Sequence, residues 1–308
     1  MAENDIFDAA LIAGPTASGK SALAVALARR IGGIVVNADS MQVYRDLRVL
    51  TARPTREEEA SAPHRLYGFI DAAETFSVGR WLAAVAEIIA QARSTGARPV
   101  IVGGTGLYFK ALTVGLSEIP AVPNEIRAAT RAAAEGRTPE ELHARLAALD
   151  PDTARTLRPS DPQRILRALE VFAATGKPLV SFHGARAGAL LDPARCFKLF
   201  LTPERNTLRE RIDRRFDTMM ANGALDEVAA LKERALDPAS PAMRAHGVPG
   251  LIAYLNGAAS LDDAIAKGKA DTRAYAKRQM TWFRHQMTGW TAAAPEAAES
   301  VAAQAFKP

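Results

Sequence analysis

Cysteine and long apolar runs are both scarce in this 308-residue chain, and each shortage excludes a class of protein. A single cysteine, Cys196, rules out an internal disulfide framework and any zinc site built from cysteines. No apolar run approaches the roughly 18 residues that a membrane-spanning helix needs. The first ten residues are acidic and contain no basic segment, so they do not read as a signal peptide. We therefore expect a cytoplasmic protein that has no membrane partner.

The composition is that of a globular protein with a modest excess of positive charge. Hydrophobic residues make up 48% of the chain and charged residues 24%, which is enough apolar material for a substantial core. The formal net charge is +5. Such a charge permits a polyanionic partner without requiring one, so the positions of the basic residues matter more than their number.

One segment near the N-terminus has the pattern of a phosphate-binding loop. The sequence GPTASGKS fits G-x-x-x-x-G-K-[ST], and it lies between the apolar run 9–13 and the helical spacing of 21–31. Backbone N–H groups of such a loop point at phosphate oxygens, while the lysine adds a charge and the serine can bind Mg²⁺. We predict a diphosphate-binding site with Mg²⁺ on its serine, made of Gly14, Pro15, Thr16, Ala17, Ser18, Gly19, Lys20 and Ser21.

Further strand patterns indicate an α/β fold with a parallel sheet. Apolar runs at 34–36, 100–102 and 197–201 alternate with helical patterns such as 81–93. Because parallel strands end at one edge of a sheet, the loops that contain Asp39 and Thr105 should lie beside the phosphate loop. Asp39 could bind magnesium, act as a base, or only cap an Asx turn. Thr105, within GGTGLY, could face a ligand or only cap a helix.

The chain changes character beyond the third strand pattern. Residues 123–176 carry only helical signals, including the capping box that begins at Thr138 and a helix from Asp161 to Gly176. We predict a catalytic core formed by residues 1–119 and 191–308, with a helical insertion at 120–190. The alanine-rich tail after residue 292 has no clear pattern, and we assign it no element.

Basic residues gather in three places along the chain. Each group alone is most simply a solvated helix face, but three groups together favour a nucleic-acid backbone as partner. The groups are Arg164 and Arg167; then Arg205, Arg209, Arg211, Arg214 and Arg215; and finally Arg273, Lys277, Arg278 and Arg284, interleaved with Tyr275, Trp282 and Phe283.

A series of segments resembles the tRNA dimethylallyltransferases, also called tRNA isopentenyltransferases. From about residue 10 to 290 they are GPTASGKS, ADSMQVYRDL, TARP, PHRL, VGGTGLYFKAL, DPQRILRALEV with TGKP, RIDRRFDTMMANGALDEV and TRAYAKRQMTWFR. The resemblance implies a P-loop, nucleotide-kinase-like core whose helical insertion grips the anticodon stem-loop of tRNA. It also implies transfer of a dimethylallyl group from dimethylallyl diphosphate to N6 of the adenosine 3′ to the anticodon, with release of pyrophosphate.

The resemblance assigns roles to individual residues. Asp39 would accept the N6 proton, while Thr16, Lys20 and an arginine of the RIDRRF segment would stabilise the leaving diphosphate. Arg215 is the first choice for that arginine and Arg211 the second. The tRNA contacts would fall on Asp39, Ser40, Met41, Gln42, Thr105, Arg127, Gln163, Arg164, Ile165, Leu166 and Arg167.

Two departures and three alternatives accompany this interpretation. Asp46 stands where the family often has glycine, and residues 245–250 lack the family's tyrosine and lysine, so a tRNA contact by those side chains is not carried over. A nucleotide or small-molecule kinase could use the same core with ATP, and a related prenyltransferase could act on free adenosine phosphates. The third alternative is a non-catalytic RNA-binding protein that retains only a relic of the phosphate loop. We expect a monomer whose partners are tRNA and dimethylallyl diphosphate.

Overall fold

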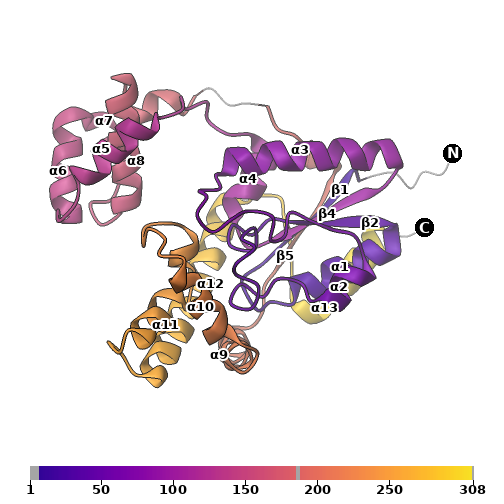
Figure 1. The fold of residues 1–308 in the computed structure, drawn as a ribbon. Helices are drawn as coiled ribbons and strands as arrows, with labels where there is room; N and C mark the ends of the chain where they lie inside the picture. Colours follow the sequence, from indigo (N-terminus) through magenta and orange to yellow (C-terminus); the bar gives the residue numbers. More distant parts are fainter. Residues whose placement is uncertain (1–6, 185–187, 307–308) are drawn as a thin grey trace. The chain divides into compact units, whose positions relative to one another are not determined.

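The computed structural model describes residues 7–184 and 188–306, which form two compact units (Figure 1). We call the first the core unit, made of Met1–Thr113 and Leu190–Pro308, and the second the helical unit, Val114–Ala189. Residues 1–6, which carry most of the segment used to exclude a signal peptide, lie outside the described residues. The roles that we assigned to residues 1–119 with 191–308 and to residues 120–190 stay predictions.

Within the described residues, a parallel sheet of six strands forms the centre of the core unit. The strand order is β3-β2-β4-β1-β5-β6, and every neighbouring pair is parallel. The predicted α/β fold is therefore confirmed. The strands are β1 (Ala9–Ala13), β2 (Gly33–Asn37), β3 (His64–Arg65), β4 (Arg98–Gly103), β5 (Cys196–Leu201) and β6 (Thr291–Ala293).

Helices cover both faces of the sheet, as the alternation of side chains along a strand requires. On β1, Leu11 packs toward α3 (Val78–Thr95) and α4 (Gly106–Val114), whereas Ile12 packs toward α1 (Lys20–Ile31) and α13 (Pro295–Ala305). Figure 1 shows the two pairs of helices on opposite sides of the strands. Since both faces are buried, β1 is apolar throughout, and β2, β4 and β5 are mostly apolar and do not alternate with polar residues.

The other helices of the core unit pack around the segment that follows β2. Val43, Tyr44 and Leu47 of this segment share a hydrophobic cluster with Phe216 and Leu251. This packing anchors the segment that directly follows Asp39. The helices are α2 (Arg56–Ser61), α9 (Arg205–Ala221), α10 (Ala224–Glu233), α11 (Val248–Leu255) and α12 (Leu261–Gln286), with short 3₁₀ turns at Pro193–Arg195 and Ala242–Arg244.

The helical unit has its own small core. Leu146, Ile165 and Leu169 are buried in it, and the predicted capping box at Thr138 is present. The chain then returns to the core unit, where the N–H groups of Leu190 and Leu191 both donate to the carbonyl of Leu112, at 3.0 and 3.2 Å. The helices are α5 (Asn124–Ala132), α6 (Pro139–Leu149), α7 (Pro151–Ala154) and α8 (Pro162–Thr175), followed by a 3₁₀ turn at Leu179–Phe182.

The C-terminal tail corrects one expectation. We assigned it no element, but β6 adds an edge strand beside β5, and α13 packs through Ala298 and Ala302 onto the sheet. Alanine has the highest helix propensity but gives little contrast between the two faces of a helix, which is why the pattern was not visible. Among the described helices, none is both long and apolar enough to cross a membrane.

Candidate active site

The phosphate loop connects β1 to α1 through a tight turn. Gly19 caps the helix with φ of 88°, and Ala17 also has a positive φ, of 62°. A Cβ on Gly14 would lie 2.7 Å from the Ser18 hydroxyl oxygen, so the turn has no room for a side chain there. Because α1 begins at Lys20, its free N–H groups and the positive end of its dipole face the loop.

Lys20 is buried beneath this loop. Its Nζ donates to the carbonyl oxygen of Pro15 at 3.1 Å. Burial lowers the pKa of Lys20 to about 8, a shift that the charge of Asp39 opposes and the charge of Arg215 reinforces. A pKa of about 8 leaves Lys20 mostly charged at neutral pH, and an anion bound in the loop would favour the charged form further.

Asp39 follows β2 and is held by its neighbours. The buried side chain of Asn37 donates to the Asp39 carbonyl at 2.9 Å and accepts from the Asp39 N–H at 2.8 Å. The Asp39 carboxylate accepts from the N–H of Met41 at 2.9 Å, so the Asx turn that we considered is present. The same carboxylate lines a cavity, and the turn therefore orients it without occupying both of its oxygens.

The loop after β4 lies against the Asp39 loop. The Thr105 hydroxyl oxygen accepts from the N–H of Ser40 at 3.0 Å, and the Thr105 N–H donates to the carbonyl of Ala38 at 3.2 Å. A Cβ on Gly103 would lie 2.1 Å from that same Ala38 carbonyl oxygen, so only glycine permits this approach. The carboxyl ends of β1, β2 and β4 thus meet as the sequence predicted.

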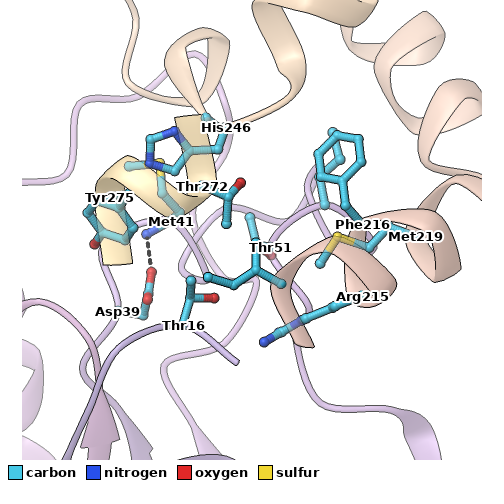
Figure 2. A pocket seen from close by; sticks show the side chains of 13 residues that line it. Thr16, Asp39, Met41, Thr51, Arg215, Phe216, Met219, His246, Thr272 and Tyr275 are labelled. Atoms are coloured by element: carbon cyan, nitrogen blue, oxygen red, sulfur yellow. Dashed lines mark hydrogen bonds between the residues drawn. The ribbon is translucent and has the colours of Figure 1, made fainter. Parts of the chain in front are cut away.

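A cavity joins the phosphate loop to Asp39 (Figure 2). Thr16 and Asp39 lie on one side of it and Arg215 of α9 on the other, with His246 and Tyr275 above them in the view. The full lining is Thr16, Asp39, Met41, Leu50, Thr51, Ile212, Arg215, Phe216, Met219, Ala245, His246, Thr272 and Tyr275.

Arg215 also lines a neighbouring cavity that is formed by the phosphate loop itself. That cavity has a volume of about 210 Å³, and its lining includes residues 17–22 and Glu58. Arg215 forms no hydrogen bond or ion pair with any described residue, and burial lowers its pKa, while the charge of Asp39 acts in the opposite direction. An arginine without a partner between a phosphate loop and a carboxylate is well placed to bind an anionic ligand.

Arg211 occupies a different position. Its guanidinium lies 3.6 Å from the Glu296 carboxylate, and the residue does not line the cavity of Asp39. One helical turn separates the two arginines, and the turn directs them to different surroundings.

Three arginines surround a buried carboxylate in the helical unit. Glu170 of α8 lies 3.0 Å from Arg131, 3.6 Å from Arg167 and 4.0 Å from Arg127, measured from carboxylate oxygen to guanidinium nitrogen. The Glu170 side chain is 5% exposed, whereas those of the arginines are 36–56% exposed. We call these four residues the arginine cluster; its formal charge is +2 on the surface of this unit.

Comparison with known proteins decides the family. The profile of the IPP transferase family matches residues 42–286, which is most of the chain. The chain belongs to this family. It is 62% identical to the tRNA dimethylallyltransferase of Methylocella silvestris over 296 residues, covering 96% of this chain and 98% of that protein. It is 64% identical to the tRNA dimethylallyltransferase of a Methylobacterium species (strain 4-46) over 291 residues, covering 94% and 95%.

A solved structure from the IPP transferase family agrees with the fold. The full-length tRNA isopentenylpyrophosphate transferase of Bacillus halodurans superposes with a TM-score of 0.68 at 32% identity, covering 97% of each chain. The resemblance inferred from the sequence motifs is therefore confirmed, and so is the predicted class of core.

The family's motif residues fall into two groups. Asp39 and Met41 line the cavity, while Ser40 bonds Thr105, and the Gln42 amide donates to the carbonyls of Thr51 and Ala52 at 2.9 and 3.1 Å. The second group is in the helical unit, where Gln163 and Arg164 are exposed and Leu166 and Arg167 are partly exposed. Ile165 is instead fully buried in the core of that unit, so its side chain is not available to RNA.

The loop after Asp39 is held by residues that motif reasoning did not single out. The Glu227 carboxylate of α10 accepts the N–H groups of Arg48, Val49 and Leu50 at 2.6, 2.7 and 2.9 Å. Asp46, the first of the two departures noted in the sequence, pairs with Arg234. These contacts connect segments about 180 positions apart, and no spacing rule in the sequence reveals them.

Sequence reasoning also missed part of the cavity wall. His246 and Tyr275 line it with their ring centroids 4.8 Å apart. Tyr275 was interpreted only as an aromatic residue among basic ones, and His246 lies in the segment that departs from the family pattern. Their meeting depends on how α11 and α12 pack together, which periodicity alone does not define.

Proposed function

We propose that this chain transfers a dimethylallyl group from dimethylallyl diphosphate to N6 of the adenosine 3′ to the anticodon of tRNA, releasing pyrophosphate. One observation carries the proposal: the phosphate loop, Asp39 and an unpaired Arg215 share one cavity. A phosphate loop alone would suit a kinase. A carboxylate facing it suits an acceptor that loses a proton as a bond forms to carbon.

The charge of the leaving group is the first requirement of this reaction. The N6–C1 bond forms while the C1–O bond breaks, so negative charge grows on the diphosphate. The loop N–H groups, Lys20 and Arg215 would bind that charge, with Thr16 beside them. Because these groups are fixed before the reaction, they favour the transition state over the bound donor.

The acceptor proton is the second requirement. An adenine amine is too weak an acid for a carboxylate to deprotonate in advance, but it becomes acidic as nitrogen bonds to carbon. Asp39 would take the proton at that stage, with its carboxylate oriented by the Met41 N–H. The base must leave its stack to reach the cavity, as in other enzymes that modify bases.

Magnesium is consistent with the residues at the phosphate loop. No group of three or more His, Cys, Asp or Glu side chains capable of holding a metal occurs among the described residues. Ser21 and Glu58 line the loop cavity, and Mg²⁺ commonly combines one or two such oxygens with substrate phosphates and water. We propose that these residues would hold Mg²⁺, which when bound would neutralise part of the diphosphate charge.

The arginine cluster supports a role for the helical unit in binding the anticodon stem-loop. Arg127 and Arg167 were predicted to contact tRNA, and we add Arg131, which shares the same carboxylate. Glu170 holds the three guanidiniums in place, and their exposed ends can bind backbone phosphates. Gln163 and Arg164 at the start of α8 would extend this surface.

The site is complete within one chain, since Asp39, Lys20 and Arg215 all belong to the core unit. We therefore expect a monomer that acts in the cytoplasm, where unmodified tRNA is found.

Incubation with unmodified tRNA and labelled dimethylallyl diphosphate, followed by nucleoside analysis, tests the proposal. The expected product is N6-dimethylallyladenosine at a single tRNA position. Parallel reactions with free adenosine monophosphate and with ATP address the alternatives. Prenylation of the free nucleotide at a rate equal to that of tRNA, or ATP consumption without prenyl transfer, would contradict it.

A further inference from the structure

Gln279 is the one buried polar side chain on α12, a helix of 26 residues that lies entirely within the described part of the chain. It is 5% exposed and does not line the cavity that contains Asp39. The mechanism above makes no use of it. A buried amide must find hydrogen-bond partners, so the identity of those partners indicates its role.

Both ends of the Gln279 amide are bonded to loops of the site. Its Oε1 accepts from the backbone N–H of Thr16 at 3.0 Å, and its Nε2 donates to the carbonyl of Gly104 at 2.9 Å. Rotating the amide by 180° would oppose donor to donor and acceptor to acceptor, so only one orientation satisfies both loops. One side chain thus ties the phosphate loop to the loop after β4.

Space around Gly104 is matched to this contact. A Cβ built on Gly104 would lie 2.0 Å from Gln279 Nε2, while the next nearest atom outside this side chain, the Gly14 carbonyl oxygen, is 3.4 Å away. Gln279 is therefore the main group that leaves no room for a side chain at Gly104.

The contact extends to the Asp39 loop. Tyr275, one turn earlier on α12, has its hydroxyl near the side chains of Gln279 and Thr105, which partly offset the rise that burial causes in its pKa. Thr105 in turn accepts from the N–H of Ser40, next to Asp39. Gln279 is thus bonded to Thr16 and Gly104, and Tyr275 lies between it and Thr105, which holds the residue beside the Asp39 carboxylate.

We propose that Gln279 is a positioning residue that fixes the phosphate loop relative to the Asp39 loop, and so sets the separation between the diphosphate and the incoming adenine. It acts through Thr16 and Gly104 and touches neither substrate. The inference rests on the proposed function for the identity of the two ligands. A shift of about 1 Å in such an arrangement can reduce turnover on the order of 100-fold.

Steady-state kinetics of Gln279→Glu and Gln279→Ala test the proposal. The glutamate variant keeps the size and the acceptor for Thr16 but opposes an oxygen to the Gly104 carbonyl. We expect kcat to fall about 10- to 100-fold in both variants, with tRNA affinity unchanged. The control is Gln286→Glu on the same helix, whose exposed side chain bonds only Lys110, at 2.9 Å, and which should keep wild-type kinetics.

A double-mutant cycle with Gly104→Ala separates positioning from general damage to the fold. Gly104→Ala alone should lower kcat strongly, whereas adding it to Gln279→Ala should cost little more, because the colliding group is gone. Melting temperatures and the fraction of protein that binds tRNA identify variants that fail to fold. Additive losses in the cycle would overturn the proposal, as would wild-type kcat in both Gln279 variants. A wild-type enzyme that transfers no prenyl group would instead overturn the proposed function.

Discussion

The phosphate loop and the arginine cluster are both proposed to bind phosphate oxygens, but they are built from different atoms. The loop uses backbone N–H groups, whose direction is set by positive φ angles at Ala17 and Gly19. The cluster uses long side chains that a single buried carboxylate, Glu170, holds together. A backbone site is rigid and suited to a charge that appears during a reaction. A site made of side chains suits a large, mobile polyanion that stays bound both before and after the reaction. The two regions should therefore respond differently to mutation, the first through turnover and the second through affinity.

Replacing Asp39 should give the largest effect on turnover. Asp39→Ala removes the proposed proton acceptor, and we expect kcat to fall about 10²–10⁴-fold while tRNA binding survives. Single-turnover prenyl transfer at saturating tRNA measures the change. Asp271→Ala, which removes an exposed carboxylate paired with Lys267 on α12, serves as the matched control. Full activity in Asp39→Ala would show that the carboxylate has no part in the chemistry.

Arg215 and Arg211 offer a comparison within one helix. Arg215→Ala removes the cation that we propose to bind the leaving diphosphate and should lower kcat about 10²–10³-fold. Arg211→Ala breaks only the ion pair with Glu296, so its activity should stay within about threefold of wild type. Initial rates at saturating dimethylallyl diphosphate measure both. The reverse order of effects would move the anion-binding role to Arg211.

The buried Lys20 predicts a loss of donor affinity at alkaline pH. As pH rises through about 8, the free enzyme loses the Lys20 charge, so kcat/KM for dimethylallyl diphosphate should decline above that pH. For a single proton the decline approaches about tenfold per pH unit. Bound diphosphate keeps Lys20 charged, so the decline in kcat should begin at a higher pH. Binding of tRNA over the same range is the control, and coincident declines in kcat and kcat/KM would contradict this assignment.

The arginine cluster should give the smallest and most graded effects. Arg131→Ala and Arg167→Ala should each weaken tRNA binding and reduce the slope of log K against log salt concentration by about one unit. Titrations at several salt concentrations measure the slope, with kcat at saturating tRNA unchanged. Arg137→Ala is the control, because Arg137 is exposed in the same unit and bonds only the Ala133 carbonyl, at 2.9 Å. An unchanged slope in Arg131→Ala would place that residue outside the RNA-binding surface.

The same contrast explains how much the sequence could reveal. The phosphate loop, its flanking strand and helix, and the α8 boundaries at Asp161 and Gly176 follow from local rules on glycine, capping and periodicity. Arg131 and Gln279 could not be found in that way. Their importance lies in contacts with Glu170, 39 positions away, and with Thr16, 263 positions away. Along α12 the charged residues dominate the pattern, so one amide among them gives no signal of burial.

The point where the chain leaves and re-enters the core unit has an evolutionary consequence. The N–H groups of Leu190 and Leu191 both donate to the carbonyl of Leu112, so the stretch from 113 to 189 starts and ends at neighbouring positions of the core unit. Exchanging or resizing that stretch leaves every hydrogen bond of the sheet intact. Under the roles that we propose for the two units, tRNA binding and prenyl transfer can therefore change independently during evolution, although one gene encodes both.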